Sequence, residues 1–589
     1  SPSSLQPLDG EAAPGPLRLQ LAEALCELRT VLRRSLWRLV PVTSSPAGVA
    51  RNTLWYHRCA GMGEDMAVLP RFEVVKDLGC GHFGAVVLVK ERCTGQLAAV
   101  KEFERPPTES PDCAAEDEGH ILNALAHPNL IRLFEVVETE SKVHVVMEFA
   151  PGATLTAHAA RTARGPWISG ALQQVLSATA YCHACRILHG DLKPENVLVG
   201  GARPDGSPFC LVSDFGHASV CMGAEQQVLA AGDPRYIPPE VVDGLRVSQK
   251  SDIFMLGMAA FELLSGGWLP FFRERAAFLD TECPFYDATQ AWFMVKSNVI
   301  QPRVRAGLAH QDRQWLQRSR LPVEQEHYTP PMEAQELVVR MLAFCEGDRP
   351  SAREVLGEPW IASGSQACKA ARAATAPAEF GLWRPRDAPG FAERARRRGR
   401  LAPRLRLIVA AMCRHLDAEA LLPARLLFRW MDLSGSGFLY EKDLRQAAER
   451  VGLDPAAAAV IFSAGDIYGE GWLDFTTFTG SLVDASGMEE EVLHRAMRSM
   501  VNHFRGPSVD DNKDAHPNSV PRTPTATLRD RVRVGASLAA SPLAAIKESA
   551  CTDWNTCIES LRSTIDQIGD DETVASLLVQ TLREEGATF

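Results

Sequence analysis

The sequence predicts the α+β fold class: a strand-rich lobe and a helix-rich lobe, followed by an all-α module and a C-terminal helical region. From Arg71 onward, apolar residues alternate or cluster between glycines, which is typical of strands. The apolar spacing becomes helical around 115–127 and again after residue 170. A strand-rich segment that leads into a helix-rich one favours a two-lobed enzyme. Helical spacing returns over 418–505, which predicts the separate all-α module.

Length and composition limit the class of protein. A chain of 589 residues exceeds one hydrophobic core and predicts about three or four domains. Hydrophobic residues make up 46% and charged residues 23%, which is ordinary for a folded soluble protein. The formal charge of −11 argues against a nucleic-acid partner, and no apolar run is long enough for a transmembrane segment. The 15 scattered cysteines indicate reduced thiols and an intracellular, cytoplasmic protein.

Shifts in composition divide the chain into six segments. Within the first, 17–40 has the spacing of an amphipathic helix, which would either touch a membrane or a partner or pack on the next domain. The last segment matches no motif, and we expect it to be a surface for a partner protein. The segments are a partly disordered N-terminal extension (1–70), a two-lobed catalytic domain (71–361), a linker with a basic junction helix (362–417), a helical pair (418–487), a helix with a disordered linker (488–526) and the C-terminal helical region (527–589).

The first lobe opens with a glycine-rich loop, in which Gly79, Gly81, Gly84 and Val86 complete the pattern GxGxxGxV. Glycines let the backbone lie close to phosphates, where its N–H groups can bind them. The GxGxxG pattern alone could equally open a dinucleotide-binding fold, in which it should lead into a helix. Here it leads into the strand-like run 87–89, which favours a nucleotide-binding hairpin.

A lysine follows this loop on the next predicted strand. Lys101 ends the run Ala98-Ala99-Val100-Lys101, 17 residues after Gly84. A lone strand lysine is normally a surface residue, but one this close to a phosphate-binding loop can hold phosphates. A buried ammonium needs an acidic partner, and the next helix offers both Glu116 and Glu118.

The second lobe places three complementary groups in one short loop, 189–196. Asp191 can take the proton of an attacking hydroxyl, Lys193 can neutralise a phosphate, and the amide oxygen of Asn196 can hold a metal ion. Eighteen residues after Asn196, Asp214 opens the sequence Asp-Phe-Gly. Phosphoryl transfer needs these functions within a few ångströms of one another.

In this order the motifs resemble those of the protein kinase family. The resemblance implies a two-lobed kinase fold, ATP and Mg²⁺ as cofactors, and protein substrates. It implies that Asp191 is the catalytic base, that Lys193 neutralises phosphate, and that Asn196 and Asp214 bind Mg²⁺. It also selects Glu118, nine residues before His127, as the partner of Lys101.

The same resemblance implies which residues line the nucleotide site. Met147 would stand at the back of the pocket and Ala99 against the adenine, in a set that contains Leu78, Gly79, Gly81, Gly84, Val86, Ala99, Lys101, Met147, Glu148 and Leu198. Two further pairs of motifs fit the family. Glu240 would pair with Arg349, and Asp252 would orient the backbone of the catalytic loop.

Two positions depart from the family pattern. Gly190 replaces the arginine that usually pairs with a phosphorylated activation loop, and between residues 216 and 238 the only hydroxyls are Ser219 and Tyr236. The enzyme should therefore not depend on phosphorylation through that pair. Asp233 replaces the usual threonine, and it would either pair with Lys193 or raise a neighbouring pKa, which puts full activity in question.

The all-α module contains a 12-residue run with calcium-ligand spacing. Asp432, Ser434 and Ser436 stand at positions 1, 3 and 5, Phe438 offers its carbonyl at position 7, and Asp443 stands at position 12. The run reads as an EF-hand loop with only two carboxylates, so we expect weak Ca²⁺ binding or a preference for Mg²⁺.

A second loop starts at Asp466, and its Leu473 lies 34 residues after Leu439 of the first. Paired EF-hands join through these positions. Because Tyr468 and Thr477 are poor ligands, we expect the second loop to be structural.

The order of kinase, basic amphipathic helix and EF-hand pair resembles the calcium-dependent protein kinase family over residues 72–485. In that family the junction blocks the active site until the calcium module captures it. The resemblance implies a Ser/Thr kinase that calcium regulates. Two alternatives stay open: a catalytically weak scaffold, and an active kinase whose EF-hands are purely structural.

Overall fold

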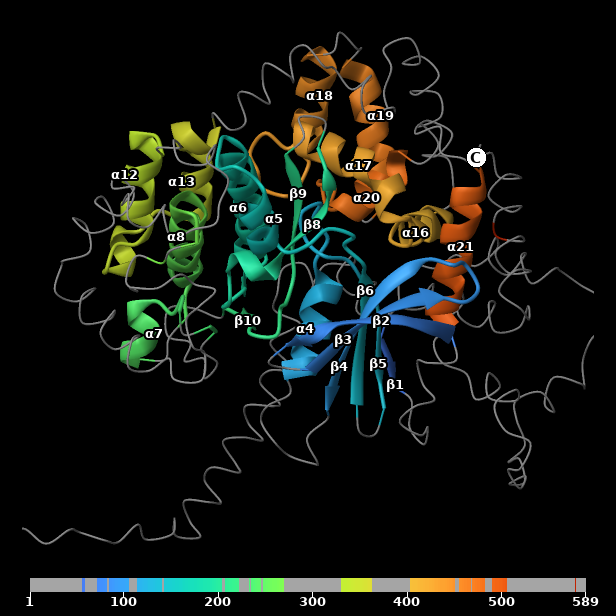
Figure 1. The fold of residues 1–589 in the computed structure, drawn as a ribbon. Coiled ribbons are helices and arrows are strands. Elements are labelled where there is room, and N and C mark those ends of the chain that lie inside the picture. Colours follow the sequence, from blue (N-terminus) through green and yellow to red (C-terminus); the bar gives the residue numbers. More distant parts are fainter. Residues whose placement is uncertain are drawn as a thin grey trace, which may run out of the picture.

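Figure 1 shows the computed structural model of the chain. It describes residues 56–58, 71–81, 84–104, 114–139, 142–203, 207–221, 232–233, 235–244, 247–267, 269, 330–362, 403–450, 455–467, 469–482, 490–505 and 578. The predicted helix over 17–40, residues 363–402 of the predicted linker and junction and, apart from Leu578, the predicted C-terminal helical region lie outside these residues.

A six-stranded sheet forms the first lobe. Its strand order is β1-β5-β6-β4-β3-β2, with β1 parallel to β5 and the other neighbours antiparallel. The strands are β1 (Tyr56–Arg58), β2 (Phe72–Gly81), β3 (Gly84–Glu91), β4 (Leu97–Glu104), β5 (Leu133–Glu138) and β6 (Lys142–Glu148). The sequence assigned residues 1–70 to an extension, yet β1 comes from this segment and lengthens the sheet by one strand.

The central strands of the sheet are buried on both faces, whereas β2 is exposed at Val74, Val75 and Leu78. Helix α4 (Ala114–Ala124) covers one face, where Ile121 and Leu122 join the main core with Val145 of β6. The opposite face carries a second apolar cluster, Phe72, Val89, Ala98, Val100, Phe134, Val137 and Val146. Strand β5 is buried at every position, as expected of a strand covered on both sides.

Helices dominate the second lobe (Figure 1). Those that the structure describes are α5 (Leu155–Arg161), α6 (Trp167–Ala184), α7 (Pro239–Gly244), α8 (Gln249–Ser265), α12 (Met332–Met341) and α13 (Ala352–Gly357). Two short ribbons lie beside them, β7 (Ile187–Leu188) with β10 (Ser219–Val220) and β8 (Val197–Ala202) with β9 (Pro208–Val212).

Helix α8 is the centre of this lobe. It is buried continuously from Ser251 to Leu264, because apolar residues surround its whole circumference. A capping box between Ser248 and Ser251 fixes its start, and Gly266 in the left-handed conformation ends it. Its rigid position matters because Asp252 projects from its first turn.

Six helices form the C-terminal module, which is defined here as residues 403–505: α16 (Pro403–Cys413), α17 (Ala418–Met431), α18 (Glu441–Arg450), α19 (Pro455–Gly465), α20 (Phe475–Leu482) and α21 (Glu490–Arg505). Leu439 and Leu473 join its two helix–loop–helix units through reciprocal N–H···O bonds of 2.9 and 2.8 Å. None of the described helices is both long and apolar enough to span a membrane.

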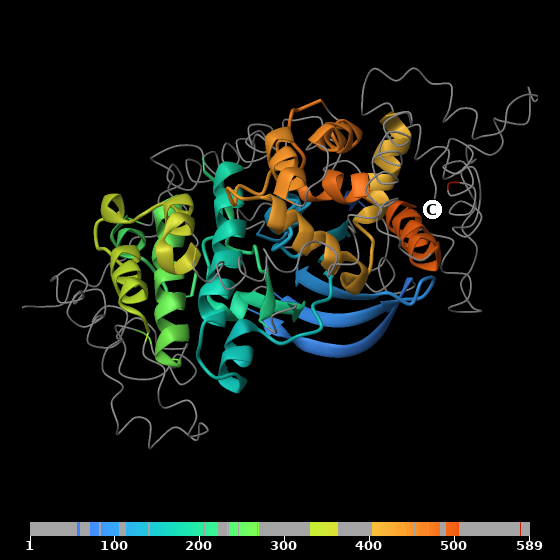
Figure 2. The same ribbon diagram turned by 90° about the horizontal axis from the view of Figure 1, so that it is seen from above.

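The C-terminal module lies along the sheet and helix α6 (Figure 2). His415, which follows α16, and His503 of α21 pack on Phe134 of β5, with ring centroids 5.4 and 5.6 Å away. Phe438 of the first loop packs on Tyr181 of α6, with ring centroids 5.0 Å apart. The module therefore covers the second face of the sheet.

Candidate active site

Lys101 lies at the centre of a buried ion-pair chain. Its Nζ is 2.9 Å from Glu118 Oε2 of α4 and 2.7 Å from Asp214 Oδ1. Burial lowers the pKa of Lys101, but the Glu118 and Asp214 carboxylates outweigh it and raise the pKa above its usual value. The lysine is therefore charged and ties three parts of the molecule together. The side chain of Glu116 lies outside the described residues.

Asp214 has an unusual backbone conformation. Its backbone adopts φ +64°, a left-handed conformation that is costly for a non-glycine residue and recurs at functional sites. The following Phe215 is buried and packs on His189, with ring centroids 4.7 Å apart, which holds this turn in place. Although burial raises the pKa of Asp214, Lys101 outweighs it and lowers the pKa below its usual value.

The catalytic loop rests on α8. Asp252 accepts hydrogen bonds from the backbone N–H groups of His189 (3.0 Å) and Gly190 (2.9 Å), and its Oδ2 lies 2.8 Å from His183 Nε2. Gly190 has φ +77°, and an added Cβ would stand 2.7 Å from the carbonyl oxygen of His217. Glycine at this position thus fits a tight, left-handed backbone.

Asp191 is held by its neighbours on both carboxylate oxygens. Lys193 Nζ and Asn196 Nδ2 both lie 2.8 Å from Oδ2, and the backbone N–H of Asp233 donates to Oδ1 at 2.8 Å. An added Cβ on Gly232 would stand 2.7 Å from Asp191 Oδ1, so glycine permits this close approach. The carboxylate is oriented and nearly fully buried.

Asp233 is neutralised by two cations. Arg235 Nη2 lies 2.5 Å and Lys193 Nζ 3.2 Å from Asp233 Oδ2. Burial raises the pKa of Asp233, but Arg235 and Lys193 more than offset it and hold that pKa at about 2. The pairing with Lys193 was one of the two sequence alternatives. The pairing of Asp233 with Arg235 was not predicted, although Arg235 stands only two residues away in the sequence.

The predicted nucleotide-lining residues come from adjacent strands. Ala99 of β4 pairs with Met147 of β6, and Val86 of β3 pairs with Lys101. An added Cβ on Gly84 would stand 1.7 Å from Glu102 O, so β3 and β4 approach as they do only because this residue is glycine. Half-buried Leu198 of β8 packs, with Val86, against the core that contains Ala99 and Met147, while Leu78 is exposed and Gly79 and Gly81 end β2.

Glu148 differs from the other predicted lining residues. Its side chain is 2% exposed and lies between two guanidinium groups, with Oε2 3.1 Å from Arg132 Nε and 2.6 Å from Arg425 Nη2. Its side chain is therefore occupied by these two ion pairs. No sequence signal pointed to Arg425, which lies 277 residues away in a different module.

The chemistry of the described donors fits a nucleotide-bound magnesium ion. Mg²⁺ in phosphoryl-transfer sites takes one or two protein oxygens and completes its octahedron with phosphates and water. Asp214 and the amide oxygen of Asn196 are such a pair. Among the described residues, no group of three or more His, Cys, Asp or Glu side chains could hold a metal ion, so a dedicated protein cage is not seen there.

The EF-hand-like loop satisfies its own polar groups. Asp432 Oδ1 accepts hydrogen bonds from Ser434 Oγ (3.0 Å) and Ser436 N–H (3.1 Å), and Oδ2 accepts one from Gly437 N–H (2.7 Å). Ser436 Oγ donates to the Phe438 carbonyl at 3.0 Å. The groups at four of the five predicted calcium-ligand positions therefore hydrogen-bond to one another.

Asp443, at the fifth predicted ligand position, and Thr477 of the second loop also accept hydrogen bonds from nearby backbone N–H groups. Asp443 Oδ2 accepts the Tyr440 N–H at 2.9 Å, at the start of α18. In the second loop Thr477 Oγ1 accepts the Asp474 N–H at 3.1 Å. Both side chains thus cap the first turns of helices.

Comparison with known proteins bears on the two lobes. Residues 72–361 match the family model described as the protein kinase domain. The serine/threonine-protein kinase SRK2H of Arabidopsis thaliana is 34% identical over 203 residues, which are 34% of this chain and 55% of that protein. The serine/threonine-protein kinase SAPK2 of Oryza sativa subsp. japonica is 34% identical over 203 residues, which are 34% of this chain and 58% of that protein. The chain spans about half the length of the curated relatives it matches.

Residues 72–361 are therefore a protein kinase domain, and these relatives are of the serine/threonine type. The family match ends at residue 361, so it does not reach the C-terminal module. The resemblance to calcium-dependent kinases and the EF-hand pair stay predictions.

Proposed function

We propose that this chain is an ATP- and Mg²⁺-dependent protein serine/threonine kinase, with residues 72–361 as its catalytic domain. The observation that carries the proposal is the ion-pair chain in which Lys101 Nζ lies 2.9 Å from Glu118 and 2.7 Å from Asp214. It joins the phosphate-binding strand, the helix of the first lobe and the Asp-Phe-Gly turn. This arrangement argues for an assembled catalytic site and against the scaffold alternative.

Each side chain of the catalytic loop has a role in this proposal. Asp191 accepts the proton of a substrate serine or threonine hydroxyl as the hydroxyl oxygen attacks the γ-phosphorus of ATP, and the bond to the β-phosphate oxygen breaks to release ADP. Lys193, 2.8 Å from Asp191 Oδ2, neutralises charge on the transferred phosphate. Asn196 and Asp214 would hold Mg²⁺, which would neutralise negative charge on the phosphates. Lys101 would hold the α- and β-phosphates.

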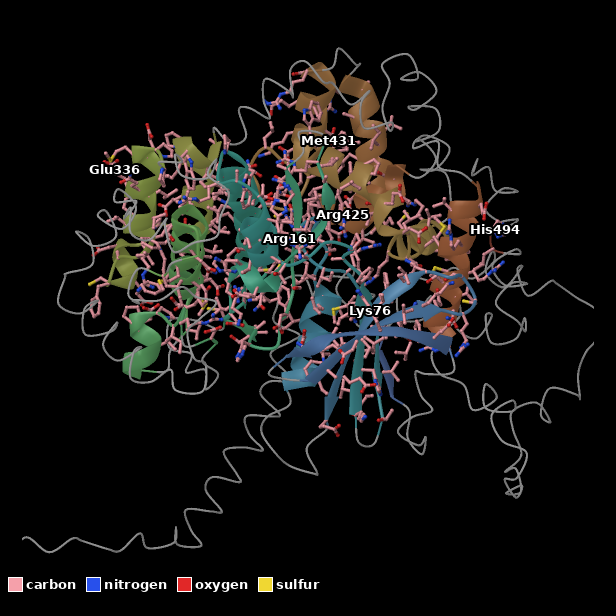
Figure 3. All side chains as sticks on the ribbon, viewed as in Figure 1. Lys76, Arg161, Glu336, Arg425, Met431 and His494 are labelled. Atoms are coloured by element: carbon pink, nitrogen blue, oxygen red, sulfur yellow. The ribbon has the colours of Figure 1, made fainter. Side chains whose placement is uncertain are left out.

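Transfer of phosphate from ATP to a generic basic peptide tests the proposal. Asp191→Asn should lower kcat about a hundredfold or more, because it removes the general base. Asp214→Ala should abolish transfer. The control is Glu336→Gln, on the surface of α12, which should leave transfer unchanged (Figure 3). A wild-type chain that binds ATP but transfers no phosphate to any peptide would support the scaffold alternative instead.

Calcium regulation through the EF-hand-like pair is the finer proposal. Its support is the ligand spacing of 432–443 together with the reciprocal backbone bonds of Leu439 and Leu473. Because only two carboxylates are available, Ca²⁺ should bind weakly, with a Kd of roughly 10 μM or more.

A calorimetric titration of the full chain with Ca²⁺, beside phosphate transfer in Ca²⁺ and in chelator, tests this finer proposal. Binding with a change in transfer rate would support it. Transfer that is indifferent to Ca²⁺, without measurable binding, would assign the pair a purely structural role.

A further inference from the structure

The C-terminal module reaches the segment that links the two lobes. Glu148 is the last residue of β6 and directly follows Met147, and the chain then runs through 149–154 into α5. The far end of this linking segment is fixed by the Gly152 N–H, which donates to Val199 O at 2.9 Å, and by a bridge between Thr154 and Leu198. The near end is fixed at Glu148.

Two arginines fix that near end, and one of them comes from the C-terminal module. Glu148 Oε2 lies 3.1 Å from Arg132 Nε and 2.6 Å from Arg425 Nη2 of α17. The three side chains are 2%, 9% and 2% exposed, respectively, so water screens their charges poorly. Burial raises the pKa of Glu148, but the two guanidinium groups outweigh it and hold the pKa at about 2.

Backbone contacts support this ion pair on both sides. Arg132 donates to the carbonyls of Arg414 (2.7 Å) and Leu416 (2.9 Å), which lie between α16 and α17. Arg414 Nε in turn donates to Leu133 O at 2.6 Å. The Glu148 N–H donates to Arg132 O at 2.9 Å, so the acid is bound to its neighbour through both backbone and side chain.

Arg425 is held where it can act on Glu148. Its guanidinium carbon lies 5.7 Å from the ring centroid of Phe209 in β9. Figure 3 labels Arg425 at the boundary between the orange helices of the module and the teal elements of the second lobe. The side chain therefore spans from the module to the nucleotide-bearing part of the kinase domain.

We propose that Arg425 is a positioning residue for nucleotide binding: by holding Glu148, it fixes the near end of the linking segment against which the adenine lies. The inference rests on the proposed kinase function for the location of the nucleotide. It assigns the C-terminal module a part in nucleotide affinity that does not depend on calcium. Without Arg425, Glu148 keeps only Arg132 as a buried cation, so the near end of the linking segment is held less firmly while the Gly152 end is unchanged.

The test compares Arg425→Gln with Arg429→Gln in the full chain. Arg429 lies one turn further along α17 and reaches Gln173 of α6 at 3.3 Å, so it matches Arg425 in residue type and helix but not in partner. Arg425→Gln should raise the Kd for Mg²⁺–ADP, measured by calorimetry, about fivefold or more. It should raise the KM for ATP by a similar factor, which is in the range of ordinary coupling between sites. The kcat at saturating ATP should stay within about twofold of the wild type, and Arg429→Gln should bind ADP normally.

Further variants separate positioning from simple stability. Arg425→Lys should recover part of the ADP affinity, and Glu148→Gln should weaken it without adding to the effect of Arg425→Gln in the double variant. A lower Tm with unchanged ADP affinity in Arg425→Gln would overturn the inference. If Arg425→Gln does not fold, Glu148→Gln with normal ADP affinity would overturn it equally. Because ADP binding requires no transfer, this result is independent of whether the chain proves to be a kinase.

Discussion

At the residue scale, the most informative position is Asp233. From the sequence it was a second carboxylate beside the catalytic base, and so a reason to question activity. In the structure Arg235 and Lys193 neutralise it, and its backbone N–H orients Asp191 at 2.8 Å. Asp233 and Arg235 therefore form an ion pair at the position where the family pattern predicts a single threonine.

Arg235→Ala should consequently impair catalysis more than Asp233→Thr. Without Arg235, Asp233 would compete with Asp191 for Lys193, and we expect kcat to fall about tenfold. The double variant Asp233→Thr/Arg235→Ala should recover most of this loss, because the excess carboxylate is then gone. Steady-state transfer to one peptide measures all three variants. Equal losses in the single and double variants would contradict the pairing.

Glu262 offers a second prediction at this scale. It is buried in α8 and hydrogen-bonded to the Tyr236 hydroxyl. Burial, with Glu195 nearby, raises its pKa to about 8. A carboxyl with a folded pKa above its unfolded value stabilises the fold at pH values below the unfolded pKa of about 4.3, and this contribution is lost as pH rises towards 8.

The Tm of the wild type should therefore fall relative to that of Glu262→Gln between pH 5 and pH 8, since glutamine does not ionise. Thermal unfolding in a pH series measures the difference between the two curves. Parallel curves over that range would mean that the pKa of Glu262 in the folded protein is not raised.

At the element scale, the sequence predicted best where the chemistry is local. The glycine loop, Lys101 and the catalytic loop are short runs that carry the family resemblance, and the expected neighbours followed from that resemblance. Strand β1 was not predicted, because three residues, Tyr56–Arg58, carry no periodicity and gain strand structure only by pairing with β5. The contact between Arg425 and Glu148 was also beyond prediction, since a pair 277 residues apart leaves no local pattern.

The hairpin of β3 and β4 shows how one glycine determines an element. Gly84 has φ +154° and would place an added Cβ 1.7 Å from Glu102 O, whereas Gly79 has φ +140° and nothing within 4 Å of an added Cβ. Gly84→Ala should therefore lower the Tm clearly more than Gly79→Ala, by a cost of about 1–3 kcal/mol for the forced shift of backbone. The comparison separates steric contact from conformational strain, which both variants share. Equal Tm values for the two variants would show that β3 and β4 can move apart at Gly84 without loss of stability.

At the scale of the whole molecule, the C-terminal module acts as a cover for the sheet. Phe134 packs on His415 and His503, and His503 Nδ1 lies 2.9 Å from the buried carboxylate of Glu135. The sequence predicted a linker and a basic, autoinhibitory-like junction helix within 362–417. The described part of that segment, α16, packs with α20 and α21. A cover of this kind and an autoinhibitor differ in what happens when the module is removed.

A chain that ends at residue 402 separates the two roles. An autoinhibitory module would leave a more active kinase behind, because the cleft would be released. A covering module would instead expose Phe134 and the apolar cluster around it, and it would leave Glu148 without Arg425. We expect the second result: a Tm lower by roughly 5 °C or more, weaker ATP binding and lower activity at every calcium concentration. A chain that ends at residue 506 keeps the module and should behave as the full chain does. Higher activity of the shorter chain at equal Tm would favour the autoinhibitory junction, since losing a cover can only destabilise the sheet that it protects.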